Sequence, residues 1–373
     1  MSSSPFLTPG RGPKGPRSAL RVGRGRTLWL ALLLVGLAAA AAAVVLVTKT
    51  SAKPQPAHRR ASSAARGHRA ASPAARAAPA PPAAPALSAT GLPLGRPPFT
   101  LRGVGEGAAD AVSLPFHSPP KAGLLFDLDD GRVLWQRNPH ARLRIASLTK
   151  MMTALLAVRS GHPDGRVLVT KEAVDTDGSK VGVLPIGRHV RFESMLYGLL
   201  LPSGNDAAVA LAQYLSGSVS RFVARMNATA AKLGLGCTRF ASPSGFIDQG
   251  NYSCAADLAE LAHLDLAQPR IAHITRTLSA VLPFPIKGGK LYLYNNNPML
   301  RYGYPGTTGL KTGYTVASGR CLVATAERRG VRLGVVLLNS SNPANQARKL
   351  LDRAFQRVYH QRPVPEPAMP TGA

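Results

Sequence analysis

The sequence predicts a single α+β domain over residues 121–361, with an antiparallel sheet that combines strands from both ends of the domain. Segments of strand-like composition lie at the start and at the end of this region, and segments with helical periodicity lie between them. No internal repeat divides the region. Roughly 240 residues are enough to bury a substantial apolar core.

Two segments of contrasting composition open the chain. Residues 1–26 are rich in Gly, Pro and Ser and carry six basic residues without an acid, so we expect a disordered cytoplasmic tail. Residues 27–48 contain no charge, and this length is sufficient to cross a bilayer. Because the arginines precede this run, we expect a single-pass anchor with everything after it exported. A cleaved signal peptide and a secreted protein are the alternative.

Two further segments lack the composition of a packed core. Residues 49–120 are rich in Ala, Pro and Arg, and residues 362–373 form a Pro-rich tail, so we expect a cationic linker and a disordered end. The formal net charge of +28 predicts an anionic environment. Membrane head groups or an acidic polymer fit this charge. The sequence has no zinc-finger, RNA-binding or aromatic-interleaved basic motif, which argues against nucleic acid.

The predicted domain opens with a hairpin and a helix. Gly123–Asp129 and Arg132–Arg137 are predicted strands, and Asp130-Gly131 between them is a strong hairpin signal. A helix is predicted over residues 145–157, because apolar residues recur there at the spacing of a buried helical face. Ser147 stands where an N-cap or first-turn residue belongs.

The middle of the domain is predicted to be mainly helical. A short strand at Val167–Thr170 is followed by a Gly-rich loop. Pro202 ends a helical segment, so Ser203 and Asn205 are expected on a turn, with side chains free to face a cleft. The predicted helices are Phe192–Leu201, Asp206–Leu215, Val219–Leu233 and Ala255–Ala267.

Strands return in the last third of the domain. Lys311 is expected on an edge strand, and Arg329-Gly330 is expected to turn between two further strands. The predicted elements are strands at Thr277–Pro283, Gly289–Tyr294, Arg320–Arg328 and Val331–Asn339, and a closing helix over residues 343–359.

Ser147 and Lys150 form a candidate catalytic pair. Three residues apart at a helix start, they lie on one side of the helix, where the amine can reach the hydroxyl. A serine is a poor nucleophile until a base takes its proton, and a desolvated lysine can be that base. The structural alternative is an N-cap serine followed by a solvated lysine.

Two more segments complete a set with this pair. Ser203-Gly204-Asn205 and Lys311-Thr312-Gly313 follow in order along the chain, and this trio marks penicillin-binding proteins and class A β-lactamases. The chain resembles a D-alanyl-D-alanine carboxypeptidase, a low-molecular-mass penicillin-binding protein of the serine peptidase type. The similarity also includes the segments at residues 200–208, 242–246, 295–300 and 309–315.

The resemblance implies both a fold and a function. The expected fold is β-lactamase/transpeptidase-like, with a mainly helical subdomain beside the sheet. The expected enzyme works outside the bacterial cell membrane and trims the terminal D-alanine from peptidoglycan stem pentapeptides through an acyl-enzyme. It would be acylated by β-lactams and would use neither a cofactor nor a metal.

The resemblance also implies roles for the residues of the set. Ser147 would attack the carbonyl, and Lys150 would accept its proton, its pKa lowered by burial and by Lys311. Ser203 and Asn205 would relay protons and hold the substrate amide. The terminal carboxylate would bind Lys311 and Thr312, and Gly313 would let the substrate backbone lie flat. Backbone N–H groups of Ser147 and Tyr314 would form an oxyanion hole.

Several alternatives remain open at this stage. Ser203 and Asn205 could cap the following helix, and Lys311 could be a solvated edge-strand lysine. A β-lactamase of the same fold is a rival, although the chain lacks a Glu-x-x-Leu-Asn motif and has Ser-Gly-Asn in place of Ser-Asp-Asn. The other rivals are a peptidoglycan endopeptidase and a catalytically idle, membrane-anchored wall-binding module.

The cysteines and histidines bear on a disulfide and on a metal site. Cys321 lies in an apolar strand and is expected to be a buried small residue. Cys237 and Cys254 could form a disulfide in an oxidising compartment or could remain free thiols. The histidines, His140 among them, show no metal-ligand spacing in the sequence.

Overall fold

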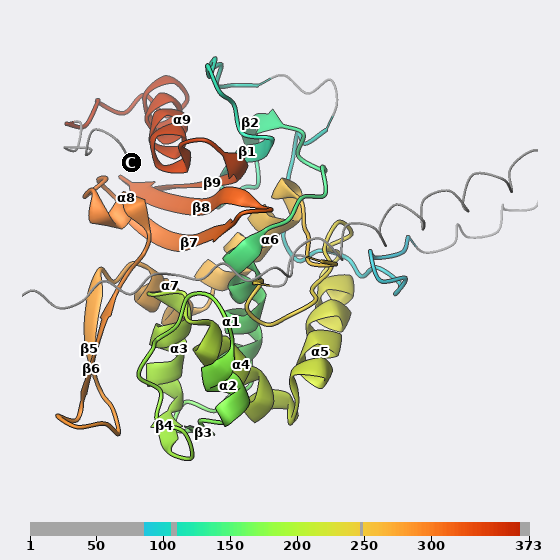
Figure 1. The fold of residues 1–373 in the computed structure, drawn as a ribbon. Coiled ribbons are helices and arrows are strands. Elements are labelled where there is room, and N and C mark those ends of the chain that lie inside the picture. Colours follow the sequence, from blue (N-terminus) through green and yellow to red (C-terminus); the bar gives the residue numbers. More distant parts are fainter. Residues whose placement is uncertain (1–85, 106–109, 247–248, 366–373) are drawn as a thin grey trace, which may run out of the picture. The chain divides into compact units, whose positions relative to one another are not determined.

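A five-stranded antiparallel sheet forms the centre of the protein in the computed structural model, which describes residues 86–105, 110–246 and 249–365 (Figure 1). The strand order is β2-β1-β9-β8-β7, so strands from the two ends of the domain share one sheet, as predicted. The strands are β1 (Ala122–Asp127), β2 (Val133–Arg137), β7 (Thr307–Thr315), β8 (Gly319–Arg328) and β9 (Val331–Ser340).

Two of the three hairpins of this sheet, β8–β9 and β1–β2, turn differently. Between β8 and β9, Arg329 and Gly330 both have positive φ, +49° and +79°, which gives the tight turn that the sequence predicted. The β1–β2 connection is longer than the predicted Asp130-Gly131 turn. β1 ends at Asp127 because its Oδ1 accepts the backbone N–H groups of residues 129 and 130, at 2.7 and 3.2 Å.

Helices cover both faces of the sheet (Figure 1). Because side chains alternate along a strand, β1 sends Leu124 and Phe126 into one apolar core and Leu125 into another. The first core contains α1 (Lys150–Arg159) and α6 (Ala255–Leu266), and the second contains α9 (Pro343–Arg357). Strands buried on both faces explain why β1 reads as a continuous apolar run.

A mainly helical subdomain lies beside the sheet, as expected. Three of its helices match predicted segments: α3 (Phe192–Leu200), α4 (Asn205–Ser216) and α5 (Val219–Lys232). The predicted strand pair in the last third is present as β5 (Ser279–Pro283) with β6 (Lys290–Tyr294). The predicted segment at Val167–Thr170 overlaps β3 (Arg166–Leu168), and its partner β4 (His189–Arg191) was not predicted. Three helices were not predicted, because each is too short to show a periodicity: α2 (Lys171–Asp175), α7 (Pro269–Thr275) and α8 (Pro298–Arg301).

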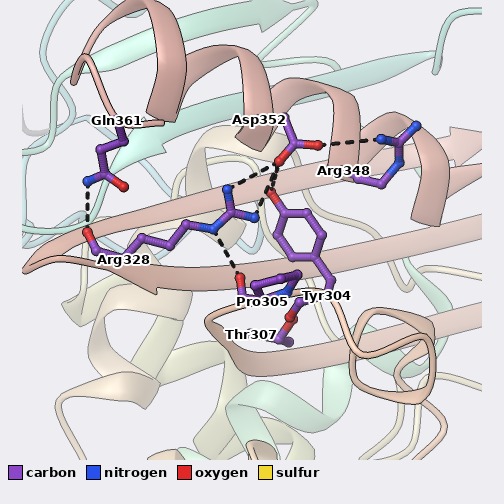
Figure 2. Close-up of polar contacts among 7 residues, drawn as sticks. All are labelled: Tyr304, Pro305, Thr307, Arg328, Arg348, Asp352 and Gln361. Atoms are coloured by element: carbon purple, nitrogen blue, oxygen red, sulfur yellow. Dashed lines mark hydrogen bonds and ion pairs between the residues drawn. The ribbon is translucent and has the colours of Figure 1, made fainter. Parts of the chain in front are cut away.

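An arginine network fixes the chain that leads into β7. Figure 2 shows Arg328, at the end of β8, donating to Asp352 on α9 at 3.3 Å and to the carbonyl of Pro305 at 3.1 Å. Tyr304 donates to the same carboxylate at 2.8 Å, and the guanidinium lies 4.6 Å from its ring centroid. Arg328 is only 9% exposed, so the pair is shielded from water. These contacts join α9, β8 and the start of β7 into one unit.

The folded region begins earlier than predicted. Part of the predicted 49–120 linker packs on the domain: Phe99, Leu101 and Val112 are buried, and Val112 donates its N–H to the carbonyl of Leu134 at 2.9 Å. A few apolar residues spaced among Pro and Gly are enough to hold this segment on the domain. The average composition of residues 49–120 does not reveal such isolated contacts.

The predictions for residues 1–26, 27–48 and 49–85 lie outside the described residues, as does the end of the tail from residue 366. In the part of the chain that the structure describes, no helix combines the length and apolar character needed to cross a membrane.

Cys237 and Cys254 form a disulfide, with Cα atoms 5.6 Å apart, which decides between the two alternatives that the sequence left open. Cys321 is 2% exposed, as predicted. His140 lies beside the disulfide, although the sequence showed no such grouping: its ligand atom and the two sulfurs are all within 4.8 Å of one another. Both sulfurs are engaged in the covalent bond.

Candidate active site

Ser147 lies on a single turn of 3-10 helix, η1 (Ala146–Thr149), immediately before α1. Ala146 has a positive φ of +46°, which turns the chain sharply into this segment. Ser147 is the second residue of this turn, so the prediction of a first-turn residue is confirmed, and the N-cap position belongs to Ile145. Lys150 begins α1 one turn later, and its Nζ lies 2.8 Å from Ser147 Oγ. The predicted contact between amine and hydroxyl is therefore present.

The amine of Lys150 is completely buried, with 0% exposure. Besides Ser147 Oγ, its Nζ contacts Asn205 Oδ1 at 2.7 Å and the backbone carbonyl of Ser244 at 2.8 Å. These two oxygens can only accept hydrogen bonds, so they take both N–H groups of a neutral amine. The nitrogen lone pair is then left for the hydroxyl proton of Ser147. This geometry allows Lys150 to act as a base, and the same three oxygens would also accept the three N–H groups of an ammonium, so the protonation state depends on the electrostatics.

Electrostatics favour the neutral amine over the ammonium. Burial, followed by the charge of Lys311, holds the pKa of Lys150 well below its usual 10.5, and Asp206 acts in the opposite direction. Burial alone lowers the pKa of Lys311 to about 7. Two buried amines therefore lie in one site, and the pKa of each is lowered.

The turn between α3 and α4 carries Ser203 and Asn205. Ser203 has a positive φ of +66°. The N-cap of α4 is Gly204, which has no side chain to cap the helix, so the alternative that Ser203 or Asn205 is the N-cap of α4 is wrong. Asn205 is the first residue of α4. Its amide Nδ2 donates to the carbonyl of Asp177 at 2.6 Å, which orients Oδ1 toward Lys150.

Lys311 projects from β7, the edge strand of the sheet, and is 2% exposed, so the alternative of a solvated edge lysine is wrong. Its Nζ donates to Ser203 Oγ at 2.9 Å and to the carbonyl of Thr312 at 2.9 Å. The edge strand and the interhelical turn are thus linked directly across the site.

Gly313 allows β7 to approach η1, the turn that carries Ser147, which we call the nucleophile turn. A Cβ at this position would lie 2.8 Å from the carbonyl oxygen of Ile145, closer than packed atoms tolerate, and 3.2 Å from the backbone nitrogen of Ser147, which is a tight contact. We expected the glycine to make room for substrate, and the structure shows that it first makes room for the protein's own backbone.

A pocket of about 320 Å³ opens onto these residues. Ser147, Ser203, Thr312, Gly313 and Tyr314 line it, whereas Lys150, Asn205 and Lys311 are buried next to residues of its wall. The Tyr314 side chain is 65% exposed. All eight residues that the sequence singled out are therefore gathered at one pocket, with the hydroxyl groups open to it and the amines shielded.

Sequence reasoning missed two contributors. The carbonyl of Ser244 contacts Lys150, but a backbone atom leaves no signal in residue types; the only indication was that residues 242–246 belong to the resemblance. Asp206 is 1% exposed and accepts the N–H groups of Val181 and Gly182 at 2.9 and 3.1 Å. It holds the loop next to Asn205, a role that only the fold reveals.

Comparison with known proteins agrees with this geometry. A family model described as D-alanyl-D-alanine carboxypeptidase matches residues 110–342, more than half of the chain. The carboxypeptidase DacF of Bacillus subtilis is 36% identical over 252 residues, covering 65% of this chain and 64% of that protein. The carboxypeptidase DacB2 of Mycobacterium tuberculosis is 36% identical over 255 residues, covering 66% and 86%. The chain thus spans just under two thirds of the length of the Bacillus relative.

Solved structures show the same fold. A D-alanyl-D-alanine carboxypeptidase from Mycobacterium tuberculosis H37Rv matches with a TM-score of 0.61 and 33% identity over 65% of this chain and 94% of that one. A mutant of the Streptomyces K15 DD-transpeptidase matches with a TM-score of 0.61 and 29% identity over 65% and 99%. The predicted transpeptidase-like fold is confirmed, and the chain belongs to the D-alanyl-D-alanine carboxypeptidase family.

Proposed function

We propose that the protein is a serine D-Ala-D-Ala carboxypeptidase that removes the terminal D-alanine from peptidoglycan stem pentapeptides. The observation that carries this proposal is the arrangement around Lys150. When the amine is neutral, Asn205 Oδ1 and the carbonyl of Ser244 can take both of its N–H groups, which leaves its lone pair for the hydroxyl proton of Ser147. A general base must lie within hydrogen-bond reach of the proton that it abstracts, and 2.8 Å satisfies this requirement.

In the first half of the proposed reaction, Ser147 Oγ attacks the carbonyl carbon of the penultimate D-alanine, and its proton passes to Lys150. Backbone N–H groups of Ser147 and Tyr314 stabilise the oxyanion, each such donor contributing about 3 kcal/mol in the transition state. The C–N bond then breaks. Ser203 relays a proton to the leaving amine, and free D-alanine departs.

In the second half, water attacks the acyl-enzyme. Lys150 again accepts a proton, the bond between the acyl carbon and Ser147 Oγ breaks, and the serine recovers its hydrogen. The product is the stem tetrapeptide. β-Lactams would acylate Ser147 through the same attack. Like the substrate, they present an amide beside a carboxylate, and their amide is strained by its four-membered ring.

Lys311 and Thr312 are proposed to bind the terminal carboxylate of the substrate. Lys311 is a buried cation whose two hydrogen-bond partners, Ser203 Oγ and the Thr312 carbonyl, carry no charge. A substrate carboxylate would therefore supply the counter-charge that the site lacks, and its binding would raise the pKa of Lys311 from about 7. Asn205 is proposed to hold the substrate amide.

The cellular setting is proposed from the sequence. Residues 27–48 would anchor the protein in the bacterial cell membrane, with the catalytic domain outside, and the disulfide of Cys237 and Cys254 suits an oxidising compartment. The basic charge would hold the domain near anionic wall material. Membrane fractionation of the full chain, with and without residues 27–48, tests the anchor; a wild-type protein found only in the soluble fraction would refute it.

A turnover assay on the pentapeptide L-Ala-γ-D-Glu-L-Lys-D-Ala-D-Ala tests the proposed activity. We expect free D-alanine and the tetrapeptide, identified by mass spectrometry, with the wild type and with a Ser160→Ala control, and none with Ser147→Ala. Ser160 is a matched serine at the far end of α1. Cleavage confined to a cross-linked peptide dimer, or to penicillin, would instead assign an endopeptidase or a β-lactamase.

A further inference from the structure

A second pocket, of about 450 Å³, lies beside the candidate active site. We call it the cationic pocket, and its walls include Lys121, Arg142, Arg144, Tyr252, Ser318 and Asn339. It is located at the end of the sheet where β1 begins, β9 ends and the β7–β8 hairpin turns. Its other wall is the segment that leads to the nucleophile turn.

The charge of this pocket has one sign. Three of its lining residues are cations and none is an acid. Arg142 donates to the carbonyl of Gly236 at 3.3 Å. Burial raises the pKa of the nearby Asp257 carboxyl to about 6, and the charge of Arg142 partly opposes this rise. The side chains of Lys121 and Arg144 have no hydrogen bond or ion pair with any residue in the described ranges. Two cations are therefore available to an anion.

The cationic pocket adjoins the candidate active site along two segments. Arg144 precedes Ser147 by three residues, and its carbonyl accepts from Sγ of Cys321, at 3.9 Å, a residue that lines the active-site pocket. Ser318 follows Tyr314 by four residues across the hairpin. A ligand that extends beyond Tyr314 along β7 leads toward the cationic pocket.

The proposed substrate orientation predicts which part of the ligand arrives there. With the terminal carboxylate at Lys311 and Thr312 and the scissile carbonyl at Ser147, the N-terminal part of the peptide runs toward the β7–β8 turn. An extended chain rises about 3.3 Å per residue, so a group two residues before the scissile D-alanine lies about 7 Å further along. Long cationic side chains such as Arg144 can span the remaining distance.

We propose that the cationic pocket binds a carboxylate carried by the substrate two residues before the D-alanine whose carbonyl is attacked. This inference rests on the proposed function and adds a specificity site to it. Lys121 and Arg144 supply the charge, and the polar groups of Tyr252 and Asn339 complete the lining. The ligand class is thus an acidic stem peptide, recognised at both ends by cations.

Two pentapeptides that differ by one charge test the proposal. One is L-Ala-γ-D-Glu-L-Lys-D-Ala-D-Ala, and the other carries D-isoglutamine, the neutral amide, at the second position. At low ionic strength the wild type should have a kcat/KM about five- to tenfold higher for the acid than for the amide, through a lower KM. High salt should reduce this preference.

The double variant Lys121→Gln and Arg144→Gln should lose the preference and keep the wild-type kcat/KM on the amide, which also shows that it is folded. Arg357→Gln on α9 removes the same kind of charge from another part of the protein and should keep the preference. Equal rates of the wild type on both peptides, or a preference that survives in the double variant, would overturn the proposal. Failure of the proposed function would look different, because neither peptide would then be cleaved.

Discussion

The substitution Asn205→Asp places one negative charge beside the proposed base with almost no change in shape. Asn205 Oδ1 lies 2.7 Å from Lys150 Nζ, and both residues are buried. A carboxylate at this distance favours the protonated amine, and a protonated amine cannot take the hydroxyl proton of Ser147. The variant also loses the hydrogen bond from Nδ2 to the Asp177 carbonyl, so the wrong protonation state of the base is identified from the pH profile.

The size of this effect follows from Coulomb's law. At an effective dielectric constant of about 20, two unit charges 2.7 Å apart interact by about 6 kcal/mol, which corresponds to about four pKa units. Stronger screening that halves the interaction would still raise the pKa of Lys150 by about two units. The pH at which Lys150 loses its proton, and at which acylation therefore rises, should then move up by at least about two units.

The assay is the rate of acylation by a fluorescent penicillin at saturating concentration, followed from acidic to alkaline pH. In the wild type the rate should rise as Lys150 loses its proton, and in Asn205→Asp this rise should move to higher pH by two units or more, with the rate recovering there. The matched control is Asn227→Asp, which makes the same substitution on α5, where Nδ2 also donates to backbone carbonyls. An Asn205→Asp profile superimposable on the wild type would refute the assignment of Lys150 as the base.

Three further predictions follow from individual residues. Gly313→Ala should reduce acylation at least about tenfold, measured by penicillin labelling, because its Cβ would lie 2.8 Å from the Ile145 carbonyl and would displace β7; wild-type labelling would contradict this. Burial, and then a neighbouring aspartate, raises the pKa of Glu260 from 4.5 to about 8, so the protein should lose stability as pH rises between these values. Glu260→Gln should lessen that loss in thermal melts, and equal losses would count against it. Because the pKa of Lys311 is about 7, kcat/KM for the pentapeptide should fall as pH rises through that value, whereas kcat should fall only at higher pH, once bound carboxylate has stabilised the cation; identical alkaline limits would argue against carboxylate binding by Lys311.

The sequence was sufficient to predict much of the site, because its chemistry depends on side chains in three short segments. Ser147, Ser203 and Lys311 lie far apart in the chain, and they meet because the segments belong to a nucleophile turn, an interhelical turn and an edge strand. Each of those local structures has a pattern of its own. Each segment is common alone, so the resemblance of the ordered set to a known family carried the prediction of their convergence.

The rest depends on backbone atoms and tertiary packing, which residue types do not encode. The carbonyl that fixes Lys150 belongs to Ser244, 94 residues away, and any residue has a carbonyl. Gly313 was expected to serve the substrate, yet its first constraint is the backbone of Ile145. The docked segment around Phe99 was hidden in a Pro-rich composition that is typical of linkers. In each case the decisive fact is a contact distant in sequence.

The most direct test of the central claim is the location of the covalent intermediate. The protein is incubated briefly with benzylpenicillin, digested and analysed by mass spectrometry for the modified peptide. We predict a single penicilloyl adduct on Ser147, absent from Ser147→Ala and present in the Ser160→Ala control. An adduct on any other residue, or undiminished labelling of Ser147→Ala, would contradict the account of Ser147 as the nucleophile and Lys150 as its base.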